Sequence, residues 1–322
     1  MFSRIDPLIR LLIVCVVLAT VLPVRGMARE AAQMVSNAAV FTLFLLYGLR
    51  LSRGEVVSGL RNVRLLLPLT LWCFGAMALF GWGLWRLSLP LFDSGLDAGL
   101  ALGFLYLGCL PSTVQSATAY SSLAGGDVAS SVVAAAWLNV LGVIITAPLF
   151  ALLSGGQAGG LQGAALGKIG LLLLLPFIAG QLLQNVSRGW IADHKQTIAV
   201  MDRTTIGIAV YVAFSGAVAE GIWSRIDAQS WAVLVIACAL LLALGYGGAW
   251  VVSGLVGLVR PQRISMLFAG AQKSVAMGAP LATVLFPAKL AGLIILPLIL
   301  YHLAQLVVAA SLLGVFSSQV ED

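Results

Sequence analysis

The segment that decides the fold is residues 107–118, which have the sequence LGCLPSTVQSAT. Residues 269–280, with the sequence AGAQKSVAMGAP, form a second segment of this kind, and an offset of half the 322-residue chain brings the two into register. Both place glycine, proline and hydroxyl or amide side chains inside an otherwise apolar stretch. Because proline removes a helix hydrogen bond and glycine weakens a helix, we expect two broken transmembrane helices. Interrupted helices at matched positions of two halves indicate a transporter's binding site, although kinks packed by small residues give a similar pattern.

The composition around these segments is that of a membrane protein. Hydrophobic residues make up 61% of the chain and charged residues 9%, with a mean hydropathy of +1.05, whereas soluble domains contain roughly 25% charged residues. The net charge of +6 comes from short basic runs between apolar stretches, which is typical of cytoplasmic loops and not of a nucleic-acid surface. The four cysteines and two histidines are scattered, so we expect neither disulfides, nor a metal cluster, nor another cofactor.

The chain contains about ten apolar segments of the length that a transmembrane helix needs. They are expected at Leu8–Val24, Glu30–Leu51, Leu65–Leu87, Gly95–Ala124, Val128–Ser154, Ala165–Asn185, Thr204–Glu220, Ser230–Val259, Ile264–Phe286 and Ala291–Phe316. The first could also be a secretory signal peptide, but no small-residue cleavage pattern follows at residues 23–26. We predict an all-α polytopic fold in which residues 1–154 and 155–322 form two halves of five helices. Because five is odd, the second half would enter from the opposite side, as an inverted repeat.

The basic residues predict the orientation of the chain. Eleven of the 18 lysines and arginines flank the spans on the side that holds both termini, against six on the other side. Cytoplasmic loops are enriched in lysine and arginine, so we expect both termini in the cytoplasm and a multi-pass protein of the inner (plasma) membrane. In the loop before the fifth span, residues 125–127 predict a turn in which Asp127 caps the next helix.

Lys273 is the one basic residue that falls near the middle of an expected span. A charge there costs at least ~2.5–3.5 kcal/mol, and no acidic residue is expected at that depth to neutralise it. Two roles follow: pairing with a substrate anion, or acting as a tethered cation whose protonation alternates during transport. A lysine that extends to the interface from a misplaced span is the structural alternative.

The candidate substrate- and ion-binding residues come from the two interrupted segments and from the fifth span. Hydroxyl and amide groups in membrane helices often bond only their own backbone, but a buried amide needs several partners. The set is Ser112, Thr113, Gln115, Ser116, Ser131, Asn139, Gln272, Lys273 and Ser274.

The two segments also resemble a known family. Residues 110–117, residues 123–129 and the run Gln272-Lys273-Ser274 followed by Gly278-Ala279-Pro280 are similar to the bile acid:sodium symporter family, most closely to its SBF-like bacterial branch. The resemblance implies ten helices in a panel domain and a core domain, with broken helices four and nine crossing in the core. It also implies alternating access by movement of one domain against the other.

The sequence departs from the sodium-coupled members at one important point. The resemblance implies sodium ligands at Ser116, Ser131 and Gln272, but Phe268 stands where those members have a glutamate, and Lys273 follows the glutamine. Two like charges ~4 Å apart repel by about 4 kcal/mol at an effective dielectric of 20. The departure favours proton-linked or uncoupled transport, with sodium as the other candidate coupling ion.

We therefore expect a secondary transporter of a small organic anion and not an enzyme, because no acid pair, metal cluster or nucleophile with its base lies at membrane depth. Half-helix N-termini and Lys273 both favour a negative group on the substrate. The alternatives are an oxyanion or metalloid permease on the same fold, and a membrane sensor that binds a ligand without transporting it.

Overall fold

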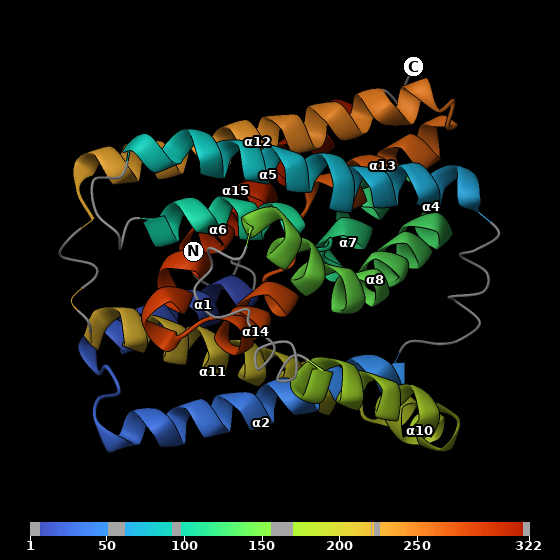
Figure 1. Ribbon diagram of the computed structural model, residues 1–322. Helices are drawn as coiled ribbons and strands as arrows, with labels where there is room; N and C mark the ends of the chain where they lie inside the picture. The colour runs from blue at the N-terminus through green and yellow to red at the C-terminus, as the bar shows by residue number, and fades with distance from the viewer. Residues whose placement is uncertain are drawn as a thin grey trace.

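The computed structural model describes residues 7–50, 62–91, 98–155, 170–219, 221 and 226–317. Within these ranges every regular element is a helix, as the composition predicts (Figure 1). The helices are α1 (Pro7–Val21), α2 (Met27–Arg50), α4 (Val63–Thr70), the π-helical turn η2 (Leu71–Ala76), α5 (Met77–Ser88), the 3-10 turn η3 (Leu89–Leu91), α6 (Ala98–Cys109), α7 (Gln115–Leu123), α8 (Val128–Ser154), the π-helical turn η4 (Gly170–Leu174), α10 (Leu175–Asp193), α11 (Lys195–Ala219), α12 (Ala228–Leu255), α13 (Arg260–Ala271), α14 (Val275–Leu285) and α15 (Ala288–Ser317).

Several of these helices are long and apolar enough to cross a membrane. Seven continuous helical stretches meet that length and composition: Met27–Arg50, Val63–Ser88, Val128–Ser154, Leu171–Asp193, Lys195–Ala219, Ala228–Leu255 and Leu290–Leu313. The protein is therefore a multi-pass membrane protein. The expected fourth and ninth spans are each divided in two, into α6 and α7 and into α13 and α14. The total of ten spans and the inverted repeat stay predictions.

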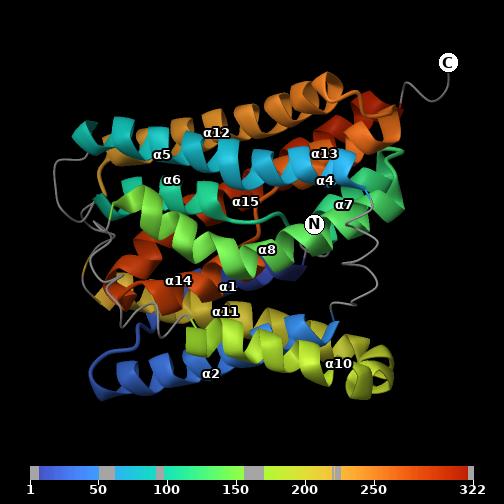
Figure 2. The same cartoon turned by 45° about the vertical axis from the view of Figure 1, so that its right-hand side comes forward.

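The helices form two groups. Helices α1, α2, α10 and α11 pack together at the lower edge of Figures 1 and 2, and α4, α5, α6, α8, α12 and α13 lie above them with α15. Glycine allows close packing inside each group: a side chain at Gly48 of α2 would collide with the carbonyl oxygen of Phe177 in α10, and one at Gly81 of α5 would collide with that of Phe104 in α6. Small residues at such contacts let membrane helices approach closely.

Two helix boundaries differ from the expected ones in a way that matters for the site. Helix α11 begins at Lys195 and not at Thr204, and α10 continues to Asp193 and not only to Asn185. Hydropathy detects the part of a helix that faces lipid, whereas the polar turns beyond it remain helical where they pack on other protein segments. The correction places Asp202 and Arg203, expected in a loop, on a helix. The first residues of the expected sixth span, 165–169, lie outside the described residues.

The predicted cap before α8 is confirmed. Asp127 accepts a hydrogen bond from the backbone N–H of Ser130 at 3.1 Å, and the Ser130 hydroxyl donates to the same carboxylate at 2.6 Å. Asp227 caps α12 in the same way, by accepting from the N–H of Ser230 at 2.7 Å. These caps fix the points at which the two long helices begin.

Candidate substrate site

The two interrupted helices break where the sequence predicts, and the two breaks touch. Residues 110–114 separate α6 from α7, and residues 272–274 separate α13 from α14. Pro111 has no N–H to continue α6. The N–H of Ser274 donates to the carbonyl of Pro111 at 3.0 Å, and the Ser274 hydroxyl caps α14 by accepting from the N–H of Met277 at 3.2 Å.

The side chain of Lys273 crosses from the second break to the first. It is fully buried, and its Nζ donates to the carbonyl oxygens of Leu110 at 2.7 Å, Gly108 at 2.9 Å and Cys73 at 3.3 Å. Two of these carbonyls belong to the end of α6, where the helix dipole is negative. The ammonium therefore compensates backbone groups that the first break leaves without helical partners.

The second break is closed by α15 with neutral groups. The amide of Gln305 bonds both backbone groups of Lys273: its Oε1 accepts from the N–H at 2.8 Å, and its Nε2 donates to the carbonyl at 3.2 Å. The hydroxyl of Tyr301 donates to the carbonyl of Ala271, the last residue of α13, at 2.6 Å. Each of these bonds satisfies a backbone group that lies at membrane depth.

A third link between the breaks uses side chains only. Oε1 of Gln272 accepts hydrogen bonds from the hydroxyls of Thr113 at 2.7 Å and Ser116 at 2.5 Å, and those two hydroxyls lie 2.6 Å apart. Gln272 itself is fully buried. It therefore holds two hydroxyl groups in place at the start of α7.

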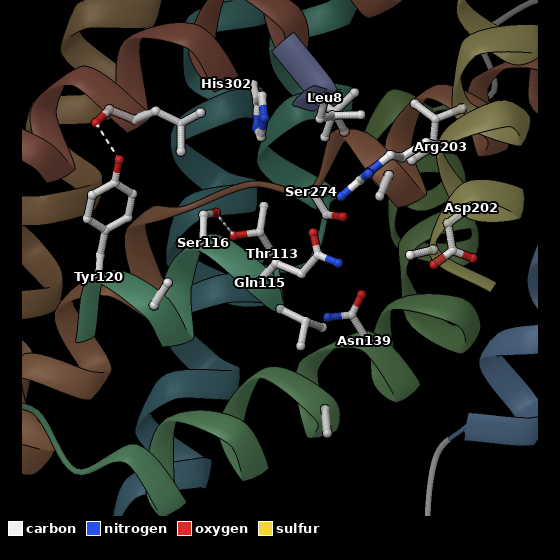
Figure 3. A pocket seen from close by; sticks show the side chains of 18 of the residues that line it. Leu8, Thr113, Gln115, Ser116, Tyr120, Asn139, Asp202, Arg203, Ser274 and His302 are labelled. Atoms are coloured by element: carbon white, nitrogen blue, oxygen red, sulfur yellow. Dashed lines mark hydrogen bonds between the residues drawn. The ribbon is translucent and has the colours of Figure 1, made fainter. Parts of the chain in front are cut away.

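A cavity of about 990 Å³ lies in front of these hydroxyl groups, between the two groups of helices. A cavity of this size suits a drug-sized ligand. Most of its wall consists of aliphatic and aromatic side chains. Polar groups are concentrated where α7 and α14 begin and on the facing turn of α8 (Figure 3); they are Thr113, Gln115, Ser116, Asn139 and Ser274.

The wall opposite the breaks contains charged residues that are not among the candidates predicted from the sequence. Arg50, Asp202 and Arg203 line the cavity from the end of α2 and the start of α11. Arg50 forms an ion pair with Asp202. Because the sequence predicts that this helix starts at Thr204, whereas α11 begins at Lys195, Asp202 and Arg203 were expected in a loop. A signal was present, since Asp202 is an acidic residue directly beside an apolar stretch.

The structure brings most of the candidate residues together, but in two layers. The five polar residues named above line the cavity. Three others lie behind them in the breaks: Gln272 and Lys273 are fully buried, and Ser112 uses its carbonyl to accept from Nδ2 of Asn139 at 3.1 Å. These three residues position the wall without forming part of the cavity surface.

Ser131 is the candidate that stands apart. Its hydroxyl lies 2.6 Å from that of Ser121 and donates to that of Ser265 at 2.9 Å, in a buried cluster where α7 ends and α8 begins. Two of the three residues implied as sodium ligands, Ser116 and Gln272, meet through a hydrogen bond, and Ser131 lies apart from them. Phe268, buried at the expected glutamate position, offers no oxygen. The residues present therefore lack the carboxylate that the implied sodium sites share.

Membrane-spanning helices, two of them broken at a shared point beside a polar-lined cavity, define the chain as a membrane transporter. It belongs to the SBF-like CPA transporter family, whose model matches residues 6–318. Similar proteins include PA2026 of Pseudomonas aeruginosa (37% identity; 97% of this chain and 92% of the relative) and the putative symporter YfeH of Escherichia coli (35%; 100% and 96%). The mouse sodium/bile acid cotransporter 7 is 23% identical over 88% of this chain and 83% of its own length. YfeH and the mouse cotransporter are named as transport proteins and not as enzymes.

Proposed function

We propose that the chain is a secondary transporter of a small organic anion and that the cavity between the two helix groups is its substrate site. The observation that supports this most is the position of the cavity: α7 and α14, the second halves of both broken helices, begin at its wall. Helix N-termini are partially positive and favour anions. The size and mostly apolar wall of the cavity favour an organic anion over a small oxyanion, which needs a compact polar site.

The two helix groups correspond in this proposal to a panel domain, with α1, α2, α10 and α11, and a core domain that contains both breaks. They are bonded to each other at one end of α2, where Nε2 of Gln33 donates to the carbonyl of Thr283 in α14 at 3.3 Å. At the other end of α2 the cavity lies between Arg50 and the core. This is one of the two states that alternating access requires. With both termini in the cytoplasm, as the basic residues predict, it is the inward-facing state of an inner-membrane protein.

Lys273 is in this proposal the fixed cation of the crossing point. Its ammonium bonds three carbonyl oxygens, which are ligands of the type that a hard cation prefers. A mobile sodium ion close to Lys273 would be repelled by it. Transport is then independent of sodium, and either proton-linked or uncoupled. The substrate does not meet Lys273 directly, because the side chain is buried behind the cavity wall.

Counterflow in proteoliposomes tests the function. Vesicles are loaded with an unlabelled organic anion that stabilises the purified protein, and uptake of the same labelled anion is followed in sodium-free and sodium-containing buffer. We expect transient accumulation in both buffers. Binding without exchange would favour the sensor, and exchange of arsenate or phosphate but of no organic anion would favour the oxyanion permease. Asn139→Leu is the matched site variant, and Thr42→Val, on an exposed hydroxyl that bonds only its own helix, is the control.

A further inference from the structure

The charges that line the cavity do not balance. Among the described lining residues the charged groups are Arg50, Asp202 and Arg203. The Arg50–Asp202 ion pair cancels one arginine. It is also held in place, because the Arg50 guanidinium lies 5.9 Å from the centre of the Tyr47 ring and the Asp202 side chain is only 13% exposed. One positive charge, that of Arg203, remains.

His302 adds no charge to this wall. The two bonds between Gln305 and the backbone of Lys273 fix which end of the Gln305 amide is oxygen and which is nitrogen. The nitrogen, Nε2, lies 2.8 Å from Nδ1 of His302 and can only donate to it. A ring that accepts at Nδ1 has a single N–H, on Nε2, and is neutral. Lys273 is separated from the cavity by its burial, so the net charge of the described lining residues is +1.

Arg203 is oriented to use that charge. The side chains of adjacent helix residues point in different directions, so the Arg203 side chain does not follow that of Asp202 toward Arg50. Figure 3 shows its side chain extending from α11 toward Ser274 at the start of α14, with Gln115 and Asn139 nearby. A ligand group between Arg203 and these residues would meet a guanidinium on one side and amide and hydroxyl donors on the other. Guanidinium groups bind carboxylates and sulfonates through paired hydrogen bonds.

We propose that Arg203 is the residue that recognises the anion and that the cavity is selective for organic monoanions, each with one carboxylate or sulfonate on an apolar body. This inference rests on the proposed function and adds to it the charge class of the substrate. A monoanion neutralises the cavity, whereas a dianion would bring a second negative charge that finds no cation among the described lining residues. The apolar walls then receive the rest of the molecule.

The test uses ligand pairs that differ by one charge: decanoate with decanedioate, and taurolithocholate with its 3-sulfate. Binding to the full-length protein in nanodiscs is measured by calorimetry, with empty nanodiscs subtracted. For wild type we expect each monoanion to bind about 10-fold or more tightly than its dianion. Arg203→Gln should lose about 10-fold or more of monoanion affinity. Arg188→Gln, which removes an exposed charge outside the cavity lining, should bind like wild type.

The net charge itself is tested by Asp202→Asn and by the double variant Arg50→Gln/Asp202→Asn. Asp202→Asn raises the cavity charge by one and should accept dianions. The double variant lacks the ion pair but restores the charge, and should prefer monoanions again. Equal affinity of Arg203→Gln and wild type for monoanions, or a double variant that prefers dianions, would overturn the inference and leave the proposed function standing. A folded wild type that binds none of the monoanions would overturn both.

Discussion

The two broken helices solve the same problem with different chemistry. At the first break, residues 110–114, the freed carbonyls of α6 are compensated by a charge that comes from the other half of the chain, the ammonium of Lys273. At the second break, residues 272–274, the freed groups are bonded by neutral side chains of the neighbouring helix, Tyr301 and Gln305. The first break therefore depends on a charge from the second, whereas the second receives from the first a neutral group, the carbonyl of Pro111 that accepts from the N–H of Ser274. A substitution of Lys273 should therefore destabilise both breaks, whereas a substitution of Tyr301 or Gln305 in α15 should destabilise mainly the second break.

The largest expected effect is that of Lys273→Met. The variant keeps the length of the side chain but leaves the buried carbonyls of Gly108 and Leu110 without their donor, and each unsatisfied buried group costs about 1–3 kcal/mol. We expect a loss of at least about 3 kcal/mol of stability, seen as a much lower melting temperature in detergent. A melting temperature equal to that of wild type would show that the first break does not need the charge.

Gln305→Leu should have the next largest effect. It removes both bonds to the backbone of Lys273, at a cost of about 1–3 kcal/mol. The variant should melt below wild type but above Lys273→Met. The control is Gln181→Leu, at a site away from the breaks. It removes the bond from Nε2 of Gln181 to the carbonyl of Gly48, which is 2.6 Å long. If Gln305→Leu proved the more damaging, the order of dependence between the two breaks would be reversed.

Tyr301→Phe and Tyr106→Phe form a matched pair with smaller effects. Each removes one hydroxyl that donates to a backbone carbonyl at 2.6 Å, of Ala271 for Tyr301 and of Gly278 for Tyr106. Both should lower stability by about 1 kcal/mol, the net contribution of one buried hydrogen bond. Tyr301 bonds α13, before the second break, and Tyr106 bonds α14, after it. Similar melting temperatures for the two variants would indicate that neutral bonds contribute alike on both sides of the second break. If neither variant melts below wild type, the two tyrosine hydroxyls do not stabilise the break.

The smallest effect concerns a helix start outside the breaks and depends on pH. The N–H of Ser230 donates to the Asp227 carboxylate and lowers its pKa below the ordinary value of 3.8. A carboxyl group whose pKa is lowered on folding stabilises the folded state above its unfolded pKa, and this contribution is lost as pH falls through the folded pKa. Asp227→Asn keeps an N-cap acceptor without the charge. Below pH 4 its melting temperature should fall less steeply than that of wild type. Parallel pH profiles would contradict this.

The helical class and the two breaks were predictable because their determinants are local. Glycine and Pro111 interrupt one apolar segment, and the Gln272-Lys273-Ser274 run interrupts the other, so both breaks followed from helix chemistry. The distribution of the site over two layers did not follow, because it depends on which distant groups meet. Nothing in the sequence near Lys273 indicates that its partners are carbonyls of residues 73, 108 and 110.

Arg203 and Gln305 show two other reasons for what was missed. Arg203 fell outside an expected span because hydropathy follows lipid contact, whereas α11 continues as a polar helix along the cavity. Gln305 is a single amide in an apolar helix, a pattern that usually indicates local packing. Its function depends on the position of the second break, 32 residues away. Both residues belong to contacts between segments, which periodicity does not report.

If Lys273 is a fixed cation that serves in place of a mobile ion, the melting of the protein in detergent should not respond to sodium. Wild type and Lys273→Ala are titrated with sodium, potassium or propylammonium chloride at constant ionic strength, with choline chloride as the balance. A ligand that binds only the folded state raises the melting temperature saturably. We expect no sodium-specific rise for wild type, and a rise for Lys273→Ala with propylammonium or a small metal cation, which would occupy the vacated carbonyls. A saturable sodium-specific rise in wild type, or a Lys273→Ala variant as stable as wild type and indifferent to every cation, would show that Lys273 does not take the place of an ion.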